Sequence, residues 1–419
     1  MMYPSVRTSI ERDEVADSEP LLRRIRAVPA NVVYLGLTSM VTDVSSEMVN
    51  AILPLYLISQ LRLSYLQVGF VNGMYFGITG LITIAGAVIA DRRRRYKEVA
   101  AAGYGLSAAC KVGLYAVPQA AIPATAVLMT DRVGKGVRTS PRDALISLSS
   151  EPRRFGIAFG VHRAFDTAGA LAGPVVAYLV LREAPHAYDA VFVISFLIAL
   201  IGLAILVLFV QNKRDDGRIH RTATWRAAFA LLNEPDFRTL TVVGTLLGLF
   251  TMADAFVYLT LSNEPNFNDV YFPLLAAGMA LSYLVLAIPF GHGADRVGRS
   301  RVFLAGYVLL LGVYALLLMP SLGGLGILLV LLLLGAFYAC TDGVLAAMAS
   351  VAVAEEHRTS GLAVLTAATA ISFFVSSILF PQFVDWWGTN TALRAFAVGL
   401  AVFIVIGAVA LRVRRRRYG

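Results

Sequence analysis

Charged residues interrupt long apolar runs at helical spacing, and these are the positions that could do chemistry. Residues at i, i+4, i+7 and i+11 share one face of an α-helix, and four charged residues follow that spacing: Asp131, Lys135, Arg138 and Arg142. Arg132 lies beside this stripe. Carboxylates next to guanidinium and ammonium groups can form ion pairs, exchange protons or hold a charged ligand. The spacing therefore predicts a helix whose polar face serves one of these tasks.

Two further apolar runs of the first half carry acidic residues. Asp43 and Glu47 are one helical turn apart, and so are His162 and Asp166, with Arg163 beside the second pair. A carboxylate near an arginine can change its protonation state when its neighbours or its access to water change. We expect Asp43, Glu47 and Asp166 to carry protons.

In the second half of the chain, the acidic residues within apolar runs are Asp254 and Asp342. No basic residue shares their runs, and burial without a cation favours the neutral, protonated carboxyl group. We expect both to take up and release protons. The alternative is a plain hydrogen bond from each carboxyl group to a hydroxyl or a backbone carbonyl.

The composition places these charges in a membrane. Of the 419 residues, 58% are hydrophobic and 15% are charged, and the mean hydropathy is +0.70. A hydrocarbon core about 30 Å thick needs roughly 20 apolar residues per helix. Continuous apolar runs favour helices over a barrel, whose strands would alternate. The runs predict twelve transmembrane helices near residues 31–58, 65–90, 99–117, 122–147, 156–181, 190–210, 239–262, 270–290, 302–319, 323–350, 359–380 and 390–411.

Each charge within a span costs roughly 2.5–3.5 kcal/mol at a helix centre, so these charges must pair or face water. For Arg132 we expect either an ion pair with Asp43, Glu47 or Asp166, or a place in the substrate or ion pathway. We expect Lys111 to extend toward the membrane surface. The basic residues within the predicted spans are Lys111, Arg132, Lys135, Arg138, Arg142 and Arg163, and the acidic ones are Asp43, Glu47, Asp131, Asp143, Asp166, Asp254 and Asp342.

The chain divides into two related halves. Asp43 and Asp254 are 211 residues apart, and Thr130-Asp131 and Thr341-Asp342 repeat at the same offset. We therefore predict an all-α membrane protein with two pseudo-symmetric six-helix bundles, and a substrate site near the midplane between them. The predicted parts are a disordered cytoplasmic tail (1–28), an N-terminal bundle (29–210), a cytoplasmic linker (211–238), a C-terminal bundle (239–411) and a basic tail (412–419).

The net charge of +9 comes mainly from the tails and from the loops on one side of the predicted spans. Only Arg62, Arg182 and Arg394 fall on the other side, which places both termini in the cytoplasm by the positive-inside rule. Attraction to inner-leaflet lipids accounts for the basic residues, so we expect no nucleic-acid partner. Cys110 and Cys340 have no metal-ligand spacing, and we expect neither a metal nor a cofactor.

Several motifs in order make the chain resemble the major facilitator family. Gly291-His-Gly-Ala-Asp295-Arg-Val-Gly298-Arg299 departs at one position from the family signature between the second and third helices of a half. The first-half copy, around Asp91-Arg92, lacks both glycines. Arg132 with Gly136 resembles the fourth-helix motif. Gly169-Ala-Leu-Ala-Gly173-Pro174 resembles the fifth-helix motif of the antiporter branch, without its trailing glycines.

The resemblance implies a bundle that alternates between inward-open and outward-open states, with the signature loops as a cytoplasmic latch. A carboxylate at such a loop can face a helix N-terminus or an arginine. The alternative is that the loop arginines only fix orientation. The expected latch residues are Asp91, Arg92, Asp143, Arg154, Asp295, Arg296, Gly298 and Arg299. Small residues let helices approach closely, so Gly169, Gly173 and Pro174 are expected to pack the fifth helix.

The leading functional hypothesis is a monomeric, proton-coupled transporter of a small organic solute in the inner membrane, and more specifically an exporter. The dense basic stripe instead favours import of an anionic solute. A non-transporting receptor or scaffold is a third possibility, while no catalytic motif supports a membrane enzyme. The expected substrate or proton pathway comprises Asp43, Glu47, Asp131, Arg132, Lys135, Arg138, Arg163, Asp166, Asp254 and Asp342.

The charge distribution makes a testable prediction about topology. A reporter that is active only in the cytoplasm should be active when it is fused after Gly419, because positive charge retains that end inside. A reporter that is active only in the periplasm should stay silent in the same place. The opposite pattern would overturn the predicted orientation.

Overall fold

The computed structural model describes residues 28–75, 77, 82, 95–117, 120–151, 154–213, 230–265, 267–354 and 358–418. These residues form helices and their connections, with no strand among them. Within this part of the chain, eight helices are long and apolar enough to cross a membrane. The predicted all-α membrane fold is therefore confirmed. The span expected at 65–90 is described at 65–75, 77 and 82, where it is helical.

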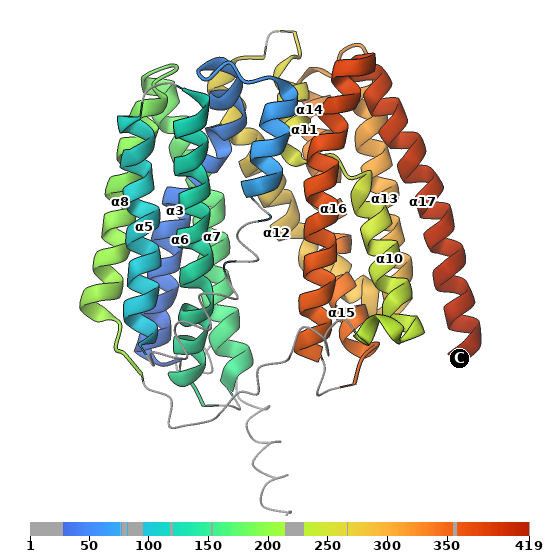
Figure 1. Ribbon diagram of the computed structural model, residues 1–419, viewed down its shortest axis with the longest axis horizontal. Helices are drawn as coiled ribbons and strands as arrows, with labels where there is room; N and C mark the ends of the chain where they lie inside the picture. The colour runs from blue at the N-terminus through green and yellow to red at the C-terminus, as the bar shows by residue number, and fades with distance from the viewer. Residues whose placement is uncertain are drawn as a thin grey trace, which may run out of the picture.

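The first group of helices comprises α3 (Ala30–Ser59), α5 (Tyr96–Ala116), α6 (Ala121–Leu148), α7 (Phe155–Glu183) and α8 (Tyr188–Phe209). α3 packs against both α7 and α8, and α5 packs against α6 and α8. These helices stand together on one side of the molecule (Figure 1). Because helices that are far apart in the sequence pack against each other, the group forms a single packed unit.

The second group comprises α10 (Pro235–Leu249), α11 (Asp254–Ser262), α12 (Phe272–Val297), α13 (Arg299–Leu317), α14 (Gly323–Thr341), α15 (Val344–Val351), α16 (Arg358–Trp387) and α17 (Thr389–Tyr418). The 3₁₀ turns η2 (Leu231–Asn233) and η3 (Asp269–Tyr271) precede α10 and α12. α14 packs on α12 and α13, while α16 packs on α10 and α17. The group occupies the other side of the molecule (Figure 1).

Two spans expected to be continuous are broken. The expected helix at 239–262 is divided into α10 and α11, and the one at 323–350 into α14 and α15. At the first break, the Tyr314 hydroxyl accepts a hydrogen bond from the Met252 amide at 2.7 Å and donates one to the Phe250 carbonyl at 2.8 Å. At the second break, Gly343 has φ +77°, which favours glycine. Breaks within a membrane are stable only where protein groups satisfy the freed backbone, as Tyr314 does.

The outer surface of the two groups is apolar. Leu208, Ile288 and Val398 expose 73%, 70% and 64% of their surface. Apolar exposure of this extent marks contact with lipid in a chain with these spans. Trp386 and Trp387 are also exposed, at the end of α16, where aromatic residues mark a membrane–water interface.

Aromatic pairs among the described residues join the two groups near one face of the membrane. We call the side where α8 ends and α10 begins the linker side, and the opposite side the outer side. Tyr178, near the outer end of α7, stacks on Tyr271 at the start of α12, with ring centroids 5.7 Å apart. Tyr65 stacks on Phe256 of α11 at 6.2 Å. The two groups are therefore in contact on the outer side.

Glycines let α7 lie directly against α3. A Cβ on Gly173 would come within 2.7 Å of the Glu47 Cβ and within 2.8 Å of the Val44 carbonyl oxygen. A Cβ on Gly169 would collide with the Met40 carbonyl oxygen and approach the Asp43 Cβ at 3.1 Å. The small residues thus set the distance between α7 and the two acidic residues of α3.

This packing predicts an effect of Gly173→Ala. The added methyl group must push α3 away, and overpacking of this kind costs about 1–3 kcal/mol, so the free energy of unfolding should fall by that amount. Thermal unfolding of the purified protein measures it. The control is Gly160→Ala on the same helix, where no atom of the described residues lies within 4 Å of the added methyl group. Equal stability of the two variants would show that α3 and α7 are not in close contact.

Candidate functional site

A charged cavity of about 370 Å³ lies between the two helix groups, on the linker side of their contacts. α3, α6 and α7 supply most of its wall, and Ala280 and Tyr283 of α12 complete it from the second group. Its charged lining residues all come from the predicted pathway except Arg142, which belongs to the predicted charged stripe but not to that pathway. They are Asp43, Glu47, Lys135, Arg138, Arg142, Arg163 and Asp166.

The polar face of α6 meets the carboxylates of α3. The Arg138 guanidinium lies 3.4 Å from the Asp43 carboxylate, and the Lys135 ammonium lies 3.8 Å from that of Glu47. The guanidinium of Arg138, with 3% of its side chain exposed, also covers the Tyr104 ring at 4.3 Å. The i, i+3 spacing on α6 thus matches the i, i+4 spacing on α3, and the charges compensate each other across the helix boundary.

A third pair joins α6 to α7. Arg142 lies 3.9 Å from the Asp166 carboxylate and donates a hydrogen bond to the Ser39 hydroxyl at 2.9 Å. His162 Nδ1 lies 3.4 Å from Asp166 Oδ2. Asp166 Oδ1 and His162 Nε2 are buried and have no hydrogen-bond partner among the described residues. An unsatisfied buried oxygen is costly when it carries charge, so a proton on Asp166 would lower that cost.

Arg163 differs from the other basic residues of the cavity. It is exposed, and among the described residues no carboxylate forms an ion pair with it. Its neighbour across the boundary between the groups is Tyr283, which lines this cavity and a second one of about 490 Å³. The first cavity therefore holds a cation that no described side chain compensates.

Asp131 and Arg132 lie outside the charged cavity. Both are buried and form an ion pair with each other, and the Lys111 ammonium lies 3.4 Å from the Asp131 carboxylate. The Arg132 guanidinium covers the Tyr75 ring at 3.8 Å. The space that these residues enclose is about 10 Å³, too small for an organic solute. We expected Arg132 either to lie in the substrate or ion pathway or to pair with Asp43, Glu47 or Asp166, and its carboxylate partner is Asp131 instead.

The expectation for Lys111 is wrong. Its side chain is 4% exposed and turns inward to Asp131. We expected outward extension because a lysine can lay its apolar stem along a short path to the membrane surface and keep its ammonium group in water. The buried carboxylate of Asp131 provides a closer counter-charge, and the pair costs less than either charge alone.

Asp254 and Asp342 occupy the two helix breaks. Asp254 begins α11 and accepts a hydrogen bond from the Tyr338 hydroxyl at 2.8 Å. Asp342 is the residue after α14, is exposed and lines the second cavity. The structure thus does not bring them together. The breaks explain why carboxylates are tolerated there, since unwound backbone lines cavities in membrane proteins.

The expected latch residues fall in separate places. Asp295 and Arg299 pair at 3.1 Å across the turn between α12 and α13, where Gly298 has φ +108°. Both belong to one helix group, so the pair does not bridge the groups. Asp143 pairs with Arg142, Arg154 pairs with Glu151, and Arg296 is exposed, while Asp91 and Arg92 lie outside the described residues.

The tyrosines of the site were not predicted from the sequence. Tyr283 borders both cavities, Tyr338 donates to Asp254, and Tyr104 lies under Arg138. A tyrosine in the middle of an apolar run could have indicated such a site residue. Its hydroxyl is buried there and needs a hydrogen-bond partner.

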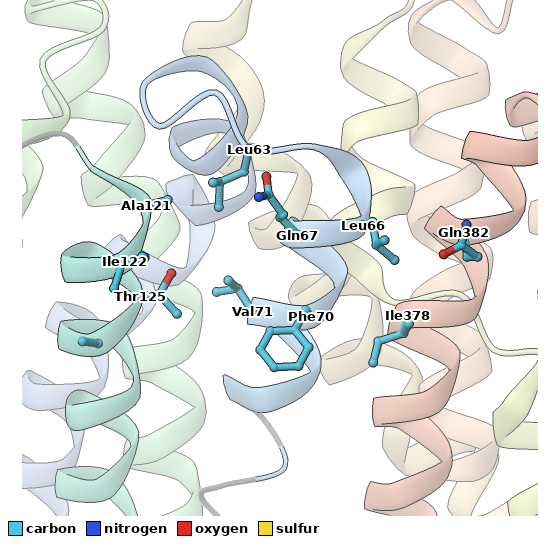
Figure 2. Close-up of a pocket in the computed structure, with 11 residues that line it drawn as sticks. Leu63, Leu66, Gln67, Phe70, Val71, Ala121, Ile122, Thr125, Ile378 and Gln382 are labelled. Atoms are coloured by element: carbon cyan, nitrogen blue, oxygen red, sulfur yellow. The ribbon is translucent and has the colours of Figure 1, made fainter.

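The largest of these cavities has a volume of about 680 Å³, and none of its described lining residues is charged. Leu63, Leu66, Phe70 and Ile378 face it on the outer side, and Gln67, Thr125 and Gln382 supply its polar atoms (Figure 2). It lies between the segment 63–71, the start of α6 and the outer end of α16. Its described lining residues therefore cannot form ion pairs like those of the charged cavity.

The chain is similar to known transporters in sequence and structure. The profile of the Major Facilitator Superfamily matches residues 35–278 and 240–419. An uncharacterized MFS-type transporter of Methanocaldococcus jannaschii is 27% identical over 362 residues, which is 84% of this chain and 88% of that protein. An uncharacterized protein of Mycobacterium tuberculosis is 29% identical over 204 residues, which is 49% of this chain and 48% of that protein.

Solved structures share the fold. The nucleoside transporter NupG superposes with a TM-score of 0.77 at 14% identity, covering 91% of this chain and 99% of that one. A POT family transporter in complex with 5-aminolevulinic acid superposes with a TM-score of 0.75 at 14% identity, covering 92% and 96%. At these identities the likeness concerns the fold alone.

The closed cluster predicts an effect of Asp131→Asn. The substitution leaves Lys111 and Arg132 buried without a carboxylate, and breaking a buried pair costs roughly 3–5 kcal/mol of folding free energy. Adding Lys111→Met should restore part of the loss, because it removes one of the two stranded cations.

Thermal unfolding of the purified variants measures both effects. The control is Asp143→Asn on the same helix, since its partly exposed pair with Arg142 should contribute no more than about 1 kcal/mol. Asp131→Asn with wild-type stability would show that Asp131 does not hold the cluster.

Proposed function

Because the chain belongs to the Major Facilitator Superfamily, a family of membrane transporters and not of enzymes, we propose that it is a proton-coupled secondary transporter of a small organic solute. The observation that carries the proposal is the charged cavity between the two helix groups. A solute bound there would touch both groups, as alternating access requires. The volume of about 370 Å³ suits a small organic molecule.

Alternating access follows from the position of the contacts. The stacked pairs Tyr178–Tyr271 and Tyr65–Phe256 close the outer side, and the charged cavity lies on the linker side of them. The proposed orientation places the linker side in the cytoplasm, so this arrangement is the inward-facing state. Opening of these contacts, together with closure of the linker side, would expose the cavity to the outside.

Proton coupling is supported by the three carboxylates of the cavity. Asp43, Glu47 and Asp166 lie 3.4–3.9 Å from their basic partners, so each pair could separate when a proton neutralises the acid. Asp166 is the proposed carrier, because its Oδ1 atom is buried without a hydrogen-bond partner. Neutral aspartic acid would release Arg142, which touches α3 through Ser39. Protonation would thereby loosen the contact between α3, α6 and α7.

The proposed direction is export from the cytoplasm, driven by protons that enter the cell. The glycines and the proline of α7 resemble the antiporter branch, and their close contact with Asp43 and Glu47 places that motif beside the proposed proton carriers. The proposed setting is the cytoplasmic membrane, with a monomeric chain and both termini inside. Asp295 and Arg299 would act there as a latch in the state that closes the linker side.

A second candidate function is the import of an anionic solute with protons. The observation in its favour is the charge of the cavity, where Lys135, Arg138, Arg142 and Arg163 face three carboxylates. Guanidinium groups bind carboxylate and phosphate well. The direction of proton movement separates import with protons from export against them.

The proposal predicts the behaviour of Asp166→Asn in proteoliposomes. A panel of small organic solutes is first screened for those that raise the Tm of the purified protein. Each of these solutes should then be transported in exchange for protons. The pH of the lumen should change in the direction that antiport requires. The Asn variant cannot carry the proton, so flux driven by the gradient should fall to the level of liposomes without a gradient. Solute exchange without net proton movement should persist.

Two results would contradict the proposal. Flux of a stabilising solute that ignores the proton gradient in the wild-type protein would exclude proton coupling. Gradient-driven flux in Asp166→Asn equal to that of the wild-type protein would exclude Asp166 as the carrier. The matched control is Asp385→Asn, which removes an exposed carboxylate at the outer end of α16.

A further inference from the structure

The charged residues that line the two central cavities are nearly all paired. The pairs are Asp43 with Arg138, Glu47 with Lys135, Asp166 with Arg142, and Asp295 with Arg299. Among the described lining residues, leaving His292 aside, the charged side chains without an ion pair are Arg163 and Asp342. They have opposite charge, and both are exposed.

The two unpaired charges belong to different helix groups and line two cavities that share one lining residue. Arg163 lies on α7 and lines the first cavity, while Asp342 lies at the break after α14 and lines the second. Tyr283 of α12 lines both cavities. We call the border that the two cavities share at Tyr283 the junction. A cation and an anion therefore face the same junction from opposite groups.

We infer that the solute is a small zwitterion, whose acidic group binds Arg163 and whose basic group binds Asp342. The planar fork of a guanidinium holds a carboxylate or phosphate through two parallel hydrogen bonds. A carboxylate holds an ammonium group in the same charge-assisted way. Tyr283 lines both cavities, and its hydroxyl can donate a hydrogen bond to the solute or accept one from it. The inference rests on the proposed function, since it names the substrate class of that cavity.

Closure of the linker side gives this assignment its physical reason. When the groups close around the junction, water leaves, and an uncompensated charge in a dry site is costly. A zwitterion provides a counter-charge for Arg163 and for Asp342 at once, whereas an anion alone leaves Asp342 uncompensated. The solute would thus join the two groups and favour closure. The unpaired cation of the first cavity, Arg163, and the unpaired carboxylate of the second, Asp342, would each bind one end of the same solute.

The test uses the full chain in lipid nanodiscs and a series of ω-amino acids as probes: β-alanine, 4-aminobutyrate and 6-aminohexanoate. At least one member should raise the Tm, while butyrate and butylamine at the same concentration should not. Arg163→Gln and Asp342→Asn should each weaken the binding of that member by about tenfold or more, since each removes a charge-assisted contact. Arg163→Lys should bind at an intermediate level, because it keeps the charge and loses the fork.

Matched controls and a charge exchange complete the test. Arg182→Gln, at the exposed far end of α7, and Asp385→Asn should bind the probe like the wild-type protein. The double variant Arg163→Glu with Asp342→Arg should regain binding that each single change loses, because a zwitterion can bind in the reverse direction. This variant also answers whether the single changes merely unfold the protein.

Several outcomes would overturn the inference. They are equal stabilisation by butyrate or butylamine alone, binding that survives Asp342→Asn, and no stabilisation by any ω-amino acid. The proposed function fails separately. Zwitterion binding that depends on both residues, without proton-coupled flux in proteoliposomes, would leave the inference standing and reject the transport mechanism. Proton-coupled flux of a solute with one charge or none would do the reverse.

Discussion

A full charge inside a bilayer needs a counter-charge or water, and this requirement fixes how α3, α6 and α7 are arranged. Arg138 and Lys135 on α6 lie opposite Asp43 and Glu47 on α3, and the pairs join only if the helices hold one register. The glycines of α7 bring a third helix close enough for Asp166 to reach Arg142. Close packing by small residues and pairing of charges thus depend on each other.

The same requirement separates charges that compensate one another from charges that form no ion pair among the described residues. Asp131, Arg132 and Lys111 compensate one another in a space that excludes an organic solute, so their contribution is to hold α5 and α6 together. Arg163 and Asp342 are exposed to cavities and form no ion pair among the described residues. Charges left free beside a cavity are the ones that a solute can compensate, and they lie on opposite helix groups. The chemistry of the proposed solute follows from this difference.

Much of the fold follows from the sequence because apolar runs longer than a bilayer leave few alternatives. The all-α membrane class and the cavity positions of Lys135, Arg138 and Asp166 were predictable from helical spacing. The partner of Arg132 was not, since helical spacing does not say how neighbouring helices are rotated. The breaks next to Asp254 and Asp342 could not be predicted either. The first depends on the Tyr314 hydroxyl, which comes from a distant span. Tyr283 could be identified as a site residue only from the structure, because its role depends on how α12 packs against the first group.

The central claim is that charges of α3 and α6 compensate each other across the helix boundary, and a double-mutant cycle on Asp43 and Arg138 tests it most directly. The free energy of unfolding is measured for the wild-type protein, Asp43→Asn, Arg138→Gln and the double variant. Each single change should strand a buried charge, so the double variant should lose less stability than the sum of the two. The expected coupling energy is about 0.5–3 kcal/mol, as for residues in one ion pair. Losses that add without coupling would contradict the account.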